Sequence, residues 1–199
     1  MACVLGGCGF DSFFLESCFF LSSHFDIVRK RFKKIKFTQL PQDNETIRSQ
    51  ISSAVAYHNV ILNTCMELQE LVKSAVFPFL LFDSILICTC FYTVIKISDI
   101  SKTLAFGGLS CATIAQLFVL TYSGDYLCSK SQSICRGIYY SNWYEGSPEQ
   151  RKYLILCMAK GSKGLVFTMG LFNLSLTTLS MILQGAGSYV ALLKSISTT

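Results

Sequence analysis

Ten cysteines and two histidines are the side chains of this 199-residue sequence that are best suited to chemistry. A zinc site needs clustered Cys and His ligands, yet His24 and His58 lie far apart and no CxxC pair occurs. A cysteine nucleophile needs a nearby histidine and an acid, and neither histidine stands in such a motif beside Cys128, Cys135 or Cys157. The sequence therefore predicts no metal, no cofactor and no catalytic site, and most thiols are expected to pack as small hydrophobic groups.

Polar residues recur at helical intervals along the last apolar segment. They are Asn173, Thr177, Ser180, Gln184 and Ser188. This spacing places them on one face of a helix, and in lipid such a face must contact protein or water. One interpretation is hydrogen bonding between helices, helped by the small residues 185–187. The other is a pore wall that continues to Leu192 and Ser195, with a bulky apolar side chain as a hydrophobic constriction. Periodicity alone favours packing.

The elements that position this stripe are expected to be membrane spans. Hydrophobic residues make up 51% of the chain and charged residues 15%, with a mean hydropathy of +0.46. Soluble domains carry roughly 25% charged residues, and a spanning helix needs about 20 mostly apolar residues. Four stretches meet this requirement, and they predict spans over residues 1–25, 74–96, 103–123 and 164–194. We therefore expect an all-α polytopic membrane helical bundle.

The first of these stretches is the weakest, because Asp11, Glu16 and His24 interrupt its Phe-rich run. It lacks the basic start of a signal peptide, so cleavage is not expected. Asp11 lies either inside the bundle, shielded by protein or water, or close to the outer interface. The sequence leaves both positions open.

Basic residues gather in alternate connections and set the expected orientation. Of the 17 lysines and arginines, 14 lie within residues 26–73 and 124–163. The positive-inside rule places these two connections in the cytosol, with the short loop 97–102 and the tail 195–199 outside. A nucleic-acid-binding protein would instead need an exposed basic face on a soluble fold. The expected partner is thus a lipid membrane and not a nucleic acid, with the basic run RKRFKKIKF as a solvated anchor facing the lipid.

Both cytosolic connections contain predicted helices. From Glu45 to Lys73 apolar residues repeat at helical spacing and lead directly into the second span. In the other connection a helix is expected to begin at Pro148, with Ser147 as its cap and Glu149 in its first turn.

The stretch from Tyr122 to Leu193 resembles the C-terminal signature of the insect odorant receptor family. In order, it holds Tyr-x-Gly-Asp-x-Leu from Tyr122, the YYSNWY element, the pair Arg151–Lys152, Leu-Ser-Leu-x-Thr, and Ser-Tyr-x-x-Leu-Leu ending at Leu193. Earlier, DSFFLESCFFLSSHFDIVRKRFKKI and HNVILNTCMELQELV resemble the family's fourth helix and its cytosolic continuation. The ordered set covers nearly the whole chain, and it is far more specific than any one element.

The resemblance implies a seven-span protein of the olfactory neuron plasma membrane, whose spans 4–7 correspond to the four here. Its C-terminus would be extracellular, in agreement with the charge distribution. It further implies an odorant-gated cation channel, assembled as a hetero-tetramer with the shared co-receptor and anchored by the cytosolic helical extensions. In this family the last helix lines the pore, so the resemblance reverses the preference for packing. Leu192 would be the gate, with Ser195 beside it at the outer mouth, and Lys194 nearby is a departure.

The resemblance also implies a pocket for a small volatile odorant in the outer half of the bundle, between the fourth and sixth helices. The implied residues are Phe10, Phe13, Phe14, Ser17, Phe106, Leu109 and Ser110. An apolar, aromatic lining suits a volatile ligand. Ordinary contacts between helices are the alternative for each of these side chains.

Three other interpretations stay open. A gustatory receptor of the same superfamily would usually end in Thr-Tyr-x-x-x-x-x-Gln-Phe, whereas Tyr189 is followed here by Leu192–Leu193. The second is a non-functional truncated receptor fragment, because the family's first three spans have no counterpart in the chain. A membrane adaptor without conductance would share the same topology.

Overall fold

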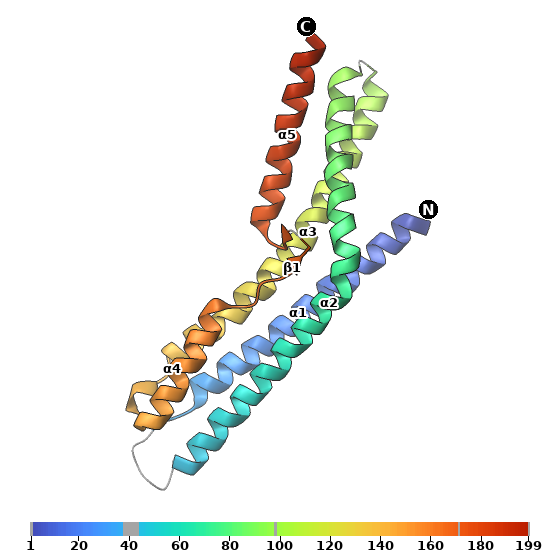
Figure 1. The fold of residues 1–199 in the computed structure, drawn as a ribbon. Helices are drawn as coiled ribbons and strands as arrows, with labels where there is room; N and C mark the ends of the chain where they lie inside the picture. The colour runs from blue at the N-terminus through green and yellow to red at the C-terminus, as the bar shows by residue number, and fades with distance from the viewer. Residues whose placement is uncertain (1, 38–43, 98, 171, 199) are drawn as a thin grey trace. The chain divides into compact units, whose positions relative to one another are not determined.

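The computed structural model describes residues 2–37, 44–97, 99–170 and 172–198. In this part of the chain five α helices and one small hairpin follow one another (Figure 1). The elements are α1 (Ala2–Lys34), α2 (Asn44–Lys96), α3 (Ile100–Tyr139), the short 3-10 helix η2 (Trp143–Glu145), α4 (Pro148–Lys163), β1 (Thr168–Met169), β2 (Phe172–Asn173) and α5 (Leu176–Thr198). The predicted all-α membrane helical class is confirmed.

The chain forms two compact units, each built from separated stretches of sequence. The first unit contains residues 1–15, 70–125 and 167–199, and therefore α5 and the hairpin. The second unit contains residues 16–69 and 126–166, and therefore α4. The long helices α1, α2 and α3 each contribute to both units.

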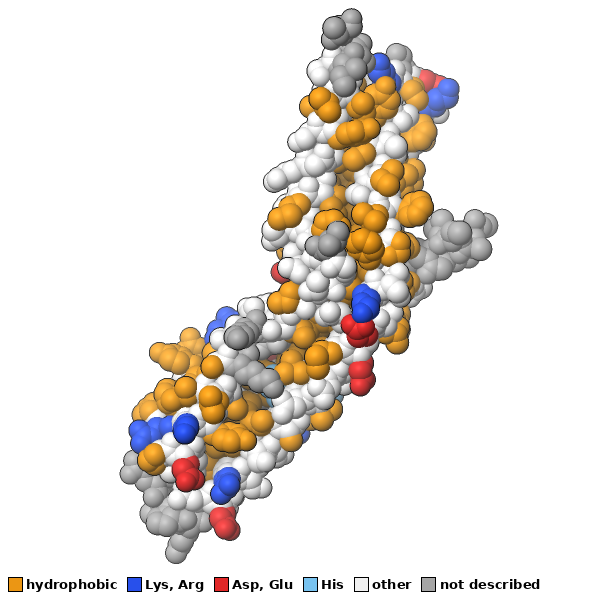
Figure 2. Space-filling model, in the orientation of Figure 1, with side chains coloured by type: hydrophobic (Ala, Val, Ile, Leu, Met, Phe, Trp, Pro, Cys, Tyr) orange, Lys and Arg blue, Asp and Glu red, His pale blue; other side chains and the backbone are white. Residues whose placement is uncertain are grey.

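Three of the described helices are long and apolar enough to cross a membrane, judged by length and composition. They are α2, α3 and the part of α5 that ends at Ser195. Figure 2 shows hydrophobic side chains spread over the surface of these helices. Phe82, for example, is 77% exposed and Leu104 is also 77% exposed. Such surface suits lipid and not water. Helix α1 is not among the three, so the span over residues 1–25 stays a prediction.

The helix predicted from Glu45 to Lys73 is confirmed as the first part of α2, which continues without a break to Lys96. Its apolar stripe is the buried face. The fully or nearly buried members are Ile47, Ile51, His58, Ile61, Cys65, Leu68 and Val72. Cys18, Cys65 and Cys90 are buried as well, in line with the expected packing role of thiols, whereas Cys111 is exposed. The side chains of Cys3 and Cys8 lie outside the described residues.

The predicted start of α4 is confirmed in detail. Ser147 Oγ accepts a hydrogen bond from the Gln150 backbone N–H at 3.4 Å, and Gln150 Oε1 accepts one from the Ser147 N–H at 3.1 Å. This reciprocal capping box satisfies two backbone donors that the helix itself leaves unpaired. Gln150 Nε2 also donates to Asn44 Oδ1 at 3.2 Å, so the cap joins the start of α4 to the start of α2.

The helical span predicted to begin at Gly164 is wrong in its first twelve positions, because α5 begins only at Leu176. The intervening hairpin pairs Thr168 with Asn173 and Met169 with Phe172. Gly164 and Gly170 have φ values of +64° and +63°. This left-handed backbone favours glycine and interrupts a right-handed helix. The sequence before α5 is uncharged, yet it is not helical.

Candidate pore helix and ligand-facing residues

Helix α5 presents two unlike faces. Toward the rest of the first unit it buries Thr178, Leu179, Ala186 and Val190. The predicted polar stripe lies on the opposite, exposed face, at Thr177, Ser180, Gln184, Ser188 and Ser195. Leu192 shares this face and is 57% exposed. The stripe thus lies within the surface of α5 that this chain leaves uncovered, which also includes Met181 and Tyr189.

The polar groups of the stripe differ in how they are satisfied. Ser180 Oγ donates to the Thr177 carbonyl at 2.7 Å, and Ser195 Oγ donates to the Leu192 carbonyl at 2.8 Å. The side chains of Gln184 and Ser188 have no hydrogen-bond partner among the described residues. Leaving an amide or hydroxyl unpaired in an apolar medium costs about 2–7 kcal/mol. In a membrane, this face of α5 therefore requires water or further protein as its hydrogen-bond partner.

Of the three small residues 185–187, the two glycines make no close contact within this chain. A Cβ added at Gly185 or Gly187 would meet no atom within 4 Å, whereas Ala186 between them is buried. The expected close helix contact through residues 185–187 therefore holds only for Ala186 in this structure. The two glycines widen the uncovered face.

Asn173 does not belong to the helical stripe. It lies in β2, where its Oδ1 accepts a hydrogen bond from Thr168 Oγ1 at 3.2 Å across the hairpin. Its backbone carbonyl accepts a hydrogen bond from Thr178 Oγ1, in the first turn of α5. Asn173 thus fixes the entry to α5, and the stripe on the helix begins at Thr177.

The candidate odorant-facing residues of α1 are distributed over both units. Phe10, Phe13 and Phe14 belong to the first unit, and Ser17 belongs to the second. Phe14 is completely buried and meets Phe167 edge-on, with 6.2 Å between the ring centroids. Phe13 is 50% exposed, and Phe10 is half-buried. Phe14 is therefore a core residue of the first unit, whereas Phe13 faces outward.

The candidate residues of α3 belong to the first unit, where Leu109 and Ser110 follow Phe106 by about one helical turn. Ser110 is buried and its Oγ donates to the Gly107 carbonyl at 2.9 Å. Phe106 is half-buried, and Leu109 is 44% exposed. The Ser110 hydroxyl is therefore satisfied within the helix, whereas the Leu109 side chain is free to contact a ligand, lipid or another helix.

A hydrogen bond that the sequence did not predict joins α1 and α3 in the first unit. Gln116 Nε2 donates to Asp11 Oδ2 at 2.6 Å, although the two residues are 105 positions apart. The other carboxylate oxygen of Asp11 is buried without a partner in the described part of the chain. This bond supports the first of the two positions considered for Asp11, inside the bundle and shielded by protein.

The glycine of the Tyr-x-Gly-Asp-x-Leu element makes a close contact with the residue that follows the hairpin. A Cβ at Gly124 would lie 2.8 Å from Leu174 Cδ2 and 3.0 Å from the Leu174 carbonyl oxygen. Leu174 is itself buried, and its N–H donates to the Phe167 carbonyl at 2.7 Å. Only glycine lets α3 approach the backbone that leads into α5.

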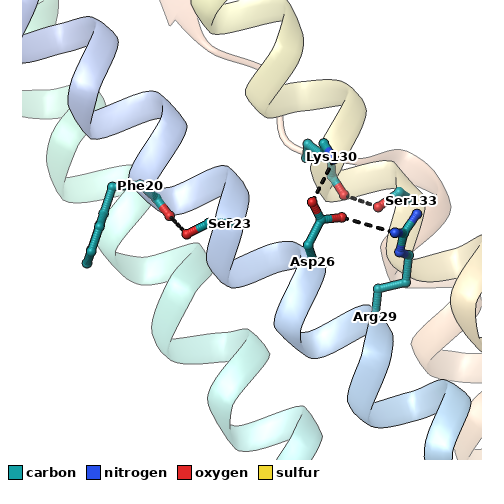
Figure 3. Close-up of polar contacts among 6 residues, drawn as sticks. All are labelled: Phe20, Ser23, Asp26, Arg29, Lys130 and Ser133. Carbon is teal, nitrogen blue, oxygen red and sulfur yellow. Dashed lines mark hydrogen bonds and ion pairs between the residues drawn. The ribbon is translucent and has the colours of Figure 1, made fainter.

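An ion pair holds α1 against α3 in the second unit (Figure 3). Lys130 Nζ donates to Asp26 Oδ2 at 2.6 Å, and Arg29 lies 3.3 Å from the other oxygen of Asp26. The Lys130 ammonium also lies 5.3 Å from the centre of the Tyr126 ring. Gly137 permits this approach, because a Cβ there would meet Arg29 Cγ at 2.5 Å. The side chains of Asp26 and Lys130 are about three-quarters buried, at 25% and 23% exposed, so solvent screens this pair less than a surface pair.

Large side chains remain exposed around α4. Tyr153, Ile155 and Leu156 are 56%, 50% and 61% exposed. Tyr140 and Tyr144, just before α4, are 73% and 60% exposed. The second unit therefore has an uncovered apolar and aromatic surface on and around α4.

This arrangement agrees with the comparisons with known proteins. The family model described as "7tm Odorant receptor" matches residues 1–187. The chain belongs to this odorant receptor family. Membership explains why long apolar helices occur together with the ordered elements from Tyr122 onward, and it makes the chain a multi-pass membrane protein.

Individual family members from Drosophila melanogaster are similar over almost the whole chain. Odorant receptor 22c is 25% identical over 203 residues, which cover 97% of this chain and 50% of that receptor. Odorant receptor 82a is 24% identical, covering 94% of this chain and 48% of the relative. Odorant receptor 10a is 22% identical, covering 96% and 48%. The chain spans about half the length of these relatives.

Proposed function

We propose that the receptor containing these helices is an odorant receptor subunit that gates a cation channel together with the shared co-receptor. The observation that carries this proposal is the uncovered polar face of α5. A membrane helix cannot leave Gln184 and Ser188 unpaired against lipid, and water in a pore would satisfy both. Leu192, on the same face, then narrows the water path as a hydrophobic gate, and Ser195 lies one turn further on.

The proposed ligand is a small volatile odorant held among α1 and α3 side chains of the first unit. The outward-facing Phe13 and Leu109 and the half-buried Phe10 and Phe106 offer apolar and aromatic surface. Such surface binds volatile compounds by burial and not by ion pairing. The buried Phe14 and Ser110 would support these side chains from behind, and Ser17 remains a candidate in the second unit.

Assembly with the co-receptor is proposed to use the exposed surface of α4 and the residues before it. Tyr and large aliphatic side chains are typical of the cores of protein interfaces. A hetero-tetramer would cover Tyr153 and Leu156 and would bring the α5 helices of four subunits around one axis. The proposed location is the plasma membrane of olfactory neurons. The distribution of basic residues supports an orientation in which the C-terminus is outside.

The direct test is an odour-evoked current. Cells that express the intact receptor with the co-receptor are expected to carry an inward cation current when a panel of volatile esters, alcohols and ketones is applied. Cells that express either protein with an unrelated membrane protein serve as controls for each subunit. If no compound in a broad panel evokes a current although both proteins reach the cell surface, the proposal is wrong.

A further inference from the structure

A basic groove of the second unit lies outside the pore helix and the ligand-facing residues. It is lined by Arg31, Lys34 and Ile35 from α1 or the residues after it, and by Ser49, Gln50 and Ser53 from α2. Ile35 is buried, and the other five side chains are exposed. Among the described residues the groove thus combines two cations, two hydroxyls and one amide, and none of its described lining residues is a carboxylate.

The guanidinium group of Arg31 is positioned by a contact with the aromatic ring of Tyr57. Its Cζ lies 4.6 Å from the centre of the Tyr57 ring, within the range of a cation–π contact. The Tyr57 hydroxyl in turn forms a hydrogen bond with His24 Nδ1. A positioned guanidinium loses less side-chain entropy on binding than a freely moving one, so Arg31 is prepared to receive an anion.

The cations of this groove have no acidic partner among the described residues. Residues 29–36 include six basic residues and no acidic one. The nearest acid along α1, Asp26, is already bound by Lys130 and Arg29. Neither Arg31 nor Lys34 forms an ion pair with an acid of the described residues. Within the described part of the chain, both cations are therefore available to an anionic ligand.

We propose that this groove binds a compact polyphosphate of the inositol phosphate type. Arginine and lysine bind phosphate oxygens by charge-assisted hydrogen bonds, and the fork of arginine can contact two of them at once. Ser49, Gln50 and Ser53 offer further hydrogen bonds to phosphate oxygens and to ring hydroxyls. The same chemistry is found in a free inositol polyphosphate and in the headgroup of a phosphoinositide lipid.

The test measures the dissociation constant of inositol trisphosphate for the full chain, purified in nanodiscs of neutral lipid. Saturable binding is expected. Lys34→Gln and Arg31→Gln are each expected to weaken it about tenfold, because each removes a charge-assisted hydrogen bond. Lys33→Gln is the matched control, since it removes the same charge from the same turn but Lys33 does not line the groove. This control is expected to weaken binding by less than about threefold.

A second arm distinguishes the two sources of the phosphate. Nanodiscs that contain a phosphoinositide bisphosphate lipid are expected to block binding of the soluble probe if the headgroup reaches the groove. If the soluble probe still binds with unchanged affinity, a free polyphosphate is the ligand. Equal losses in Lys33→Gln and Lys34→Gln would show that only diffuse charge attracts the probe, and that result would overturn the site. Absence of saturable binding to the unmodified chain would overturn it as well.

Discussion

Replacing Leu192 with alanine is expected to raise the conductance of the unstimulated receptor several-fold. Leu192 lies on the uncovered face of α5, in line with Gln184 and Ser188. An apolar constriction closes by excluding water, so a smaller side chain at the narrowest point favours a wetted and conducting state. The measurement is the resting current of cells that express the receptor with the co-receptor, before any odorant is added.

The matched control is Leu193→Ala. It makes the same chemical change one position further on, at a residue that is half-buried and lies off the exposed stripe. Its resting current is expected to stay close to that of the unmodified receptor. Normal closure of the Leu192→Ala channel would show that Leu192 is not the gate. An equal leak in both variants would assign the effect to general loosening of α5.

Replacing Gly124 with valine is expected to destabilise the first unit. The added side chain would meet the backbone oxygen of Leu174 at 3.0 Å as well as its side chain, and the backbone cannot rotate away. Overpacking of this kind costs about 1–3 kcal/mol. For a chain of this length such a cost lowers the Tm by about 2–12 °C. Thermal unfolding of the purified chain in nanodiscs measures the change.

Gly108→Val is the control on the same helix. A Cβ at Gly108 meets nothing within 4 Å, so the same substitution adds no clash there. Its Tm is expected to match that of the unmodified chain. If both variants lose equal stability, the cause is the valine in α3 and not the contact between Gly124 and Leu174.

Local sequence signals predicted the elements whose ends depend on neighbouring residues. Ser147, Pro148 and Gln150 define the start of α4 by themselves, because a capping box involves only residues three positions apart. The first part of α2 was likewise predictable, since its apolar residues repeat with the helical period and that stripe is buried.

The start of α5 was not predictable from local signals. An uncharged run from Gly164 onward satisfies the length and hydropathy of a span, and these quantities do not distinguish a helix from a hairpin. The hairpin depends on left-handed backbone at Gly164 and Gly170 and on the packing of Leu174 against Gly124. That contact joins residues that are 50 positions apart in the sequence, and no local sequence pattern before α5 predicts it.

The polar contacts between helices could not be predicted from the sequence either, because they too join distant residues. Asp11 and Gln116, like Asp26 and Lys130, are about a hundred residues apart and belong to no motif. Sequence periodicity did place Thr177, Ser180, Gln184 and Ser188 on one face of α5. Periodicity alone favoured packing of that face against other helices, whereas within this chain the structure leaves the face uncovered.

The most direct test of the proposed pore is the reaction of single cysteines on α5 with a charged, water-soluble thiol reagent. The cysteine thiolate attacks the reagent, and this thiolate forms readily in water and hardly at all in lipid or a packed interior. Ser188→Cys, on the exposed stripe, is expected to react during odorant stimulation and to lose its current progressively. Ala186→Cys, at a position 2% exposed, is expected to keep its current, as is the unmodified receptor, whose native cysteines include the ten of this chain. A Ser188→Cys channel that opens normally and yet reacts no faster than Ala186→Cys would contradict a water-filled pore along this face.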